Sequence, residues 1–343
     1  MVPNGWSNTT IDDNISFSGG AQPPRSVFAF EPQEGFIRLI QIRDYKTDKF
    51  ATYIPKDLAR KLCTADDVMI GRYGPPIFQI LRGLEGAYNV ALIKAIPKEG
   101  VDKEFMYYSL KRNDLFRLID SHSQRTSGQT GIEMDALKAF PMPLPPLPEQ
   151  QKIAKILTTW DKAIDSTERL IDNSKKQKKA LMQQLLTGKK RLLDDEGKRF
   201  EGEWNWVKIK EICAKVIDNR GKTPPLSTNG LPLVEINSIV GNKYPQLSKI
   251  TKFVSEDTFN TWFRNGHPTK GDILVATVGS AGINALVDLE EGFGCIAQNL
   301  IALRTKPCVD DTFLYYLMNT PDYFSKVQAV VMGAVQPSIK VPH

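Results

Sequence analysis

One long segment carries apolar residues at alternating steps of four and three, which is the spacing of a coiled-coil seam. No proline or glycine lies between Pro148 and Gly188, which mark the ends where such a helix would start and stop. The pattern predicts a helix within residues 148–188, about 58 Å long at about 1.5 Å per residue. A long helix of an all-α bundle would show similar spacing. The predicted packing positions are Ile153, Leu157, Trp160, Ile164, Ile171, Leu181 and Leu185.

The segments before and after this helix repeat the same blocks in the same order. An apolar strand leads into a polar turn at 36–45 and again at 230–239. An aspartate, a buried strand and a glycine turn follow at 67–74 and at 272–279. Later matches pair 88–92 with 298–302, 101–108 with 309–316, and 129–132 with 336–339. A period of roughly 200 residues is far too long for a solenoid, so we interpret the repeat as a domain duplication.

The pattern therefore predicts an α+β protein with two homologous mixed α/β domains, 1–147 and 189–343, joined by the helix. The polar segments between the matched strands differ between the copies, for example 43–62 against 237–268. Unlike loops on a shared frame are expected of recognition modules, although ordinary loop drift would also produce them. The second copy reaches His343 without a second long helix.

The net charge of +6 and the pI near 8.9 permit a polyanionic partner without requiring one. The four cysteines show no CxxC pair, and only three histidines occur, which disfavours a disulfide framework or a zinc site. No signal peptide or membrane-spanning run is recognisable, so we expect a cytoplasmic protein.

Motifs for catalysis are not recognisable. A phosphate loop ending at Gly221-Lys222-Thr223 would need glycine where Val216 stands. We find no dinucleotide fingerprint, no S-adenosylmethionine loop, no nucleophile elbow and no metal-ligand spacing. Glu196 and Lys198 have the spacing of some nuclease sites but lie in a polar linker. We therefore expect a non-catalytic protein without a cofactor.

Two stretches, PLPPLPEQQKIAKIL at 143–157 and KKQKKALMQQLLTG at 175–188, resemble the central region of type I restriction–modification specificity subunits. The resemblance extends to the order of domain, helix and domain. It implies two target-recognition domains, each reading half of a split sequence in double-stranded DNA. It also implies that the helix forms half of an antiparallel coiled coil and docks methyltransferase subunits, while a separate motor/nuclease subunit cuts. This chain departs from the family by lacking the second helix, and we expect a homodimer to cover the seam.

Phosphate contacts would position such domains and base contacts would specify the sequence. The candidate DNA contacts are polar residues, mostly basic or amide, in or beside the polar loops that follow the matched strands. They are Arg43, Lys46, Lys49, Arg72, Tyr73, Arg125 and Gln129 in the first domain, and Arg220, Lys222, Asn237, Lys243, Thr277 and Gln336 in the second. An alternative function is a protein-interaction scaffold with two binding modules on a coiled coil and no nucleic acid.

Overall fold

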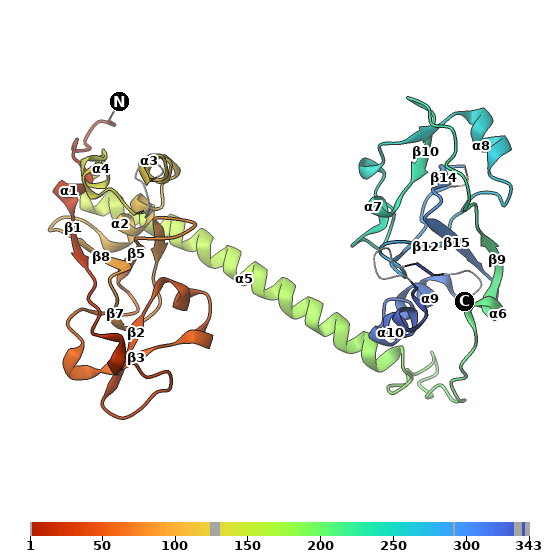
Figure 1. The fold of residues 1–343 in the computed structure, drawn as a ribbon, viewed down its shortest axis with the longest axis horizontal. Helices are drawn as coiled ribbons and strands as arrows, with labels where there is room; N and C mark the ends of the chain where they lie inside the picture. Colours follow the sequence, from red (N-terminus) through yellow and green to blue (C-terminus); the bar gives the residue numbers. More distant parts are fainter. Residues whose placement is uncertain (1, 124–130, 291, 333–337, 340–343) are drawn as a thin grey trace. The chain divides into compact units, whose positions relative to one another are not determined.

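The computed structural model describes residues 2–123, 131–290, 292–332 and 338–339 of the chain (Figure 1). It divides into two compact units, Met1–Arg169 and Leu170–His343, and the division falls inside the long helix. The three-part division at 147 and 188 therefore stays a prediction. The helix itself, α5, spans Leu147–Leu185, so the sequence located it closely. Pro148 is its second residue and not its first, because the turn already begins with Glu149 and Gln150 donating to the Pro146 carbonyl.

The first unit contains two four-stranded sheets. One sheet has the strand order β1-β8-β5-β6, and all its neighbours are antiparallel. The other has the order β3-β2-β7-β4, with β2 and β7 parallel. The strands are β1 (Ile15–Gly19), β2 (Phe36–Ile40), β3 (Tyr53–Pro55), β4 (Leu62–Cys63), β5 (Val68–Gly71), β6 (Gln79–Leu81), β7 (Gly86–Tyr88) and β8 (Leu92–Pro97).

Helices cover the first of these sheets. They are α1 (Ile11–Asn14), α2 (Lys103–Leu110), α3 (Asn113–Ser123) and α4 (Met134–Ala139), with the 3₁₀ turns η1 (Arg25–Val27), η2 (Ile42–Tyr45), η3 (Asp48–Phe50) and η4 (Lys56–Leu58) in the loops. The largest apolar core forms here, between the sheet, these helices and the start of α5. Smaller apolar clusters pack against the second sheet.

The second unit repeats this topology. Its four-stranded sheet has the order β13-β12-β15-β9, which corresponds to β6-β5-β8-β1, and every pair is again antiparallel. Its other sheet has the order β11-β10-β14, with β10 and β14 parallel like β2 and β7. The strands are β9 (Cys213–Ile217), β10 (Leu231–Val234), β11 (Phe253–Val254), β12 (Ile273–Ala276), β13 (Asn284–Leu286), β14 (Cys295–Ile296) and β15 (Leu300–Thr305). The helices are α6 (Ile209–Ile212), α7 (Ile236–Ile239), α8 (Glu256–Trp262), α9 (Asp311–Leu317) and α10 (Pro321–Val330), with η5 at Leu247–Lys249.

Details within the matched blocks confirm the duplication. Asp102 caps α2 and Asp310 caps α9, each accepting a hydrogen bond from the backbone three residues on. The matched residues Asp67 and Asp272 are each paired with a cation of the neighbouring strand. Asp67 pairs with Lys94 of β8 at 2.6 Å, and the buried Asp272 pairs at 2.8 Å with Arg304, which lies two positions further along β15 than the counterpart of Lys94. Two copies of one mixed domain are therefore present, as the sequence predicted.

The start of α5 belongs to the first unit. Gln150 is completely buried, and its side chain accepts from the Asp102 N–H at 2.8 Å and donates to the carbonyls of Gly100 and Pro145. Beside it Ala154 is buried and Ile153 packs against the first core. Ile153 is therefore a correction, because the sequence placed it in the coiled-coil seam and the structure places it in the domain.

The remaining seam positions of α5 are largely open to solvent. Trp160 is 66% exposed, Ile164 53% and Ile171 48%. Leu157 and Leu181 are also exposed and Leu185 is half-buried. Exposed apolar side chains at heptad spacing fit one helix of a coiled coil.

All four cysteines lie in the described part of the chain and are free thiols; Cys63, Cys213 and Cys295 are buried. Burial raises the pKa of the Cys63 thiol to about 11 and that of Cys295 to about 12. Within the residues that the structure describes, none of the helices combines the length and the hydrophobicity that crossing a bilayer requires.

Candidate nucleic-acid interface

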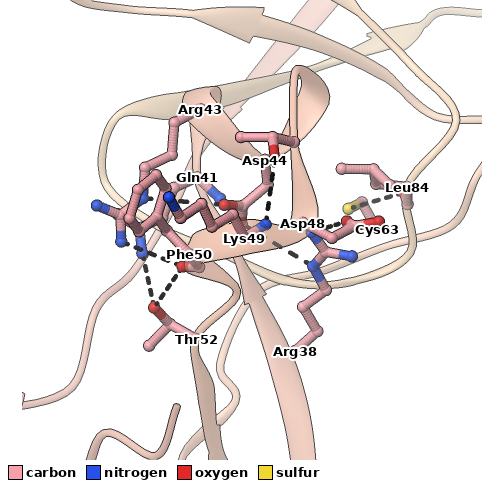
Figure 2. Close-up of polar contacts among 11 residues, drawn as sticks. Arg38, Gln41, Arg43, Asp44, Asp48, Lys49, Phe50, Thr52, Cys63 and Leu84 are labelled. Atoms are coloured by element: carbon pink, nitrogen blue, oxygen red, sulfur yellow. Dashed lines mark hydrogen bonds and ion pairs between the residues drawn. The ribbon is translucent and has the colours of Figure 1, made fainter. Parts of the chain in front are cut away.

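A folded loop follows β2 in the first domain and carries three of the predicted contacts. Arg38 of β2 holds the loop through an ion pair with Asp48 at 2.7 Å (Figure 2). Gln41 adds two bonds, from its backbone N–H to Asp44 at 3.0 Å and from its side chain to Thr52 at 3.1 Å. The loop is therefore fixed at both ends by its own side chains.

Arg43 and Lys49 gather around one exposed aromatic ring on this loop. The Phe50 ring is about half exposed, with the Arg43 guanidinium carbon at 5.7 Å and the Lys49 ammonium at 5.5 Å from its centroid. Arg43 also donates to the Phe50 carbonyl at 3.3 Å, as Figure 2 shows. Lys46, which lies between them in the sequence, is also exposed. The two cations around Phe50, with a third on the same loop, give a positive surface suited to phosphate contacts.

Asp44 supports this surface from below. Its side chain is fully buried, and burial raises the pKa of the carboxyl above its usual value, while Arg38 and Arg43, each 3.9 Å away, oppose that rise. Because the carboxylate is buried, it is not exposed to a polyanion that binds this surface.

Arg72 and Tyr73 lie together after β5. Both side chains are half-buried, and the Arg72 guanidinium carbon is 5.4 Å from the centroid of the Tyr73 ring. Tyr73 forms an isolated β-bridge with Gly131. The predicted contacts Arg125 and Gln129 lie outside the described residues, as does Gln336 of the second domain.

The second domain has a pocket of about 700 Å³ between its two sheets. Its walls come from the segments that follow β9, β10, β12 and β14, and from the residue before β11. Among the residues that the structure describes, Arg220 is the one predicted contact that lines it. The sequence did not single out the polar residues opposite, which are Thr223, Glu235, Lys252, Gln298 and Asn299. For all of these except Lys252, which precedes β11, only a position in the segments after the strands could have indicated them.

The other contacts predicted for this domain lie in different surroundings. Lys222 is exposed beside the pocket, and Asn237 is exposed and donates to the Lys249 carbonyl at 3.3 Å. The Lys243 ammonium lies 4.9 Å from the Tyr244 ring and 5.4 Å from the Tyr316 ring of α9. A hydrogen bond with Tyr244 raises the pKa of Lys243. Lys243 is thus next to α9 and does not line the pocket.

Thr277 is a correction to the predicted contacts. It is only 1% exposed, and both its backbone N–H and its hydroxyl donate to the Asn299 carbonyl, at 2.9 and 3.2 Å. The residue closes the end of β12 onto the neighbouring segment. A satisfied, buried hydroxyl cannot reach a base or a phosphate, so we withdraw Thr277 from the candidate contacts.

A metal-dependent or acid–base site is not apparent in the described residues, where no group of three or more His, Cys, Asp or Glu side chains could hold a metal ion. The carboxylates with lowered pKa values are each paired locally, for example Asp67 with Lys94 and Asp114 with Arg112. The chain is thus a duplicated α+β protein whose two copies carry different polar surfaces.

Comparison with known proteins narrows this class of protein to a family. The model of the type I restriction modification DNA specificity domain matches residues 3–174, and the chain belongs to this family. The MjaVIII specificity subunit, a type I restriction enzyme subunit from Methanocaldococcus jannaschii, is 25% identical over 99% of this chain and 81% of its own length. The putative MjaX specificity subunit from the same organism is 27% identical over 72% of this chain and 56% of its own length.

Solved structures agree on the fold. A chain from a study of complex assembly and conformational transition of the type I R-M system matches with a TM-score of 0.54 and 19% identity, covering 99% of this chain and 87% of that chain. The S subunit of a type I restriction–modification system from M. genitalium matches with a TM-score of 0.53 and 17% identity, over 98% and 86%. The predicted family and fold class are therefore confirmed.

Proposed function

We propose that each domain of this specificity subunit binds one half of a bipartite target in double-stranded DNA. The observation that carries the proposal is that the two domains share strand order and pairing while their polar loops differ. The shared sheets supply a rigid frame, and the loops supply separate recognition surfaces. The basic loop of the first domain and the pocket of the second are the two surfaces we assign to DNA.

Domain replacement tests this proposal. Residues 189–343 are exchanged for the corresponding domain of another specificity subunit, and methylated sites are mapped in cells that express the complete system. We expect one half of the methylated sequence to change and the other half to stay. A change in both halves, or in neither, would show that the domains do not read independently.

We further propose that α5 sets the separation between the half-sites and docks the methyltransferase subunits, and that the exposed seam packs against another helix. In the protein purified alone, that helix comes from a second copy of the chain. Burying the apolar seam at about 25 cal/mol per Å² would contribute several kcal/mol at least. The motor/nuclease subunit joins this assembly without contributing to recognition.

The chain supplies specificity and no chemistry in this proposal. The purified chain, incubated with S-adenosylmethionine and DNA, should transfer no methyl group above a protein-free blank. The same assay with methyltransferase subunits added is the positive control. Methyl transfer by the chain alone would mean that a catalytic site exists in it.

A further inference from the structure

Arg220 lines the pocket of the second domain, and hydrogen bonds within the protein already hold its side chain. Its Nε donates to Asp218 Oδ1 at 2.8 Å and its Nη2 to Asp218 Oδ2 at 2.7 Å, which is a bidentate pair along one edge of the guanidinium. The Arg220 backbone N–H also donates to Asp218 at 3.1 Å. The hydrogen bond from Arg220 lowers the pKa of Asp218, so the carboxylate remains charged at neutral pH.

The segment that carries this pair is anchored to the rest of the domain. Asn219 donates from its side chain to the Gly266 carbonyl at 3.0 Å and accepts from the Asn265 N–H at 3.2 Å. The Asn265 side chain donates in turn to the Asp218 carbonyl. Arg220 therefore directly follows two residues that are anchored to a distant turn, and its side chain is held by Asp218, so little conformational entropy remains to be lost when it binds a ligand.

The second edge of the guanidinium is available. Both side chains of the pair are a little over one quarter exposed, and Arg220 lines the pocket. Among the described residues no hydrogen-bond partner occurs for Nη1, and the second hydrogen of Nη2 points along the same edge. Two parallel N–H donors match the O6 and N7 acceptors that guanine presents in the major groove.

We propose that Arg220 reads a guanine in the second half-site and that Asp218 is the positioning residue that aims it. This inference rests on the proposed function and names the base and the residue pair that the second domain uses. A phosphate is the weaker fit, because the carboxylate of Asp218 cancels the charge that would attract a phosphate but leaves the outer donors unchanged. Lys222, two residues away and exposed, has no ion-pair partner in the described part and suits a phosphate contact better.

The test uses the complex of the full chain with its methyltransferase subunits and a library of duplex DNA with randomised half-sites. Bound duplexes are selected and sequenced for the wild type and for Arg220→Lys, Asp218→Asn and Lys222→Gln. Arg220→Lys keeps the charge and removes the two-donor edge. Lys222→Gln is the matched control for loss of a nearby cation.

We expect Arg220→Lys to reduce the preference for guanine about tenfold at one position of one half-site. Asp218→Asn should weaken the same preference by a smaller factor, because the guanidinium remains but is aimed less firmly. Lys222→Gln should reduce affinity for all sequences alike and leave the base preference unchanged. The remaining positions of the same half-site, which other residues of the second domain read, show that this domain is folded in each variant.

Other outcomes would overturn the proposal. If Arg220→Lys lowers affinity uniformly and base preference stays as in the wild type, Arg220 contacts a phosphate. If the wild type selects a bipartite target with no guanine affected by Arg220→Lys, the inference fails while the proposed function stands. If the wild type selects no bipartite target at all, both fail.

Discussion

The buried side chain of Gln150 joins the long helix to the first domain, and replacing it tests that attachment. Gln150→Ala removes three hydrogen bonds, to the Asp102 N–H and to the carbonyls of Gly100 and Pro145. Each of the two partly buried bonds contributes about 1 kcal/mol, and leaving the buried Pro145 carbonyl unpaired costs about 2 kcal/mol. We therefore expect the variant to lower the free energy needed to open the contact between α5 and the first domain by about 3–5 kcal/mol.

The neighbouring Gln151 provides the matched control, because its side chain is exposed on the same helical turn. Gln151→Ala should change stability by only a few tenths of a kcal/mol, since alanine is at least as good a helix former. Both variants change glutamine to alanine in one helix, so helix propensity cancels between them.

Hydrogen–deuterium exchange in increasing urea, read by mass spectrometry, locates the effect. In Gln150→Ala, peptides from 98–112 and 147–158 should lose protection at lower urea than in the wild type, while peptides from 273–305 in the second unit should not change. The reasoning would be refuted if Gln150→Ala and Gln151→Ala behaved alike. Equal loss of protection in both units would show that the attachment is not local.

Three further outcomes are expected. Inserting four helix-forming residues near Gln183 lengthens α5 by about 6 Å and should widen the spacer of the methylated target by about two base pairs while both half-sites stay the same; an unchanged spacer would mean that α5 is not a ruler. Sedimentation equilibrium at tens of micromolar should show a dimer for the wild type and a monomer for Ile164→Asp with Ile171→Asp, and a dimer unaffected by the two charges would place the contact elsewhere. Burial lowers the pKa of His267, whose ring stacks on the Phe259 ring at 3.6 Å, so the unfolded chain binds the proton more readily than the folded one. The stability of the second unit to urea should therefore fall as the pH drops below about 6.5. His267→Phe should flatten this dependence between pH 7.5 and 5.5, and an equal slope in both proteins would contradict the argument.

The amino-acid sequence determined the parts of this protein that depend on local patterns. Heptad spacing and the flanking Pro148 and Gly188 located α5, because helix formation and its ends are set by residues a few positions apart. The ordered blocks revealed the duplication, since strand patterns and caps such as Asp102 and Asp310 repeat wherever the same domain recurs. The family followed from the two stretches 143–157 and 175–188, at the start and the end of the helix.

Tertiary structure alone decided which side chains are exposed and available for binding or packing. The Thr277 hydroxyl is unavailable because it donates to a carbonyl 22 residues away. Gln150 is buried because it bonds to partners 48 and 50 residues earlier in the chain. Ile153, although it lies at a seam position, turns into the domain core because the helix begins inside the first unit. The sequence could name Arg220 as a cation but not its outward edge. Asp218 holds the inner edge, and the bonds of Asn219 to Gly266 and Asn265 fix the segment against a distant turn. Exposure and aim depend on such long-range contacts, and no local pattern records them.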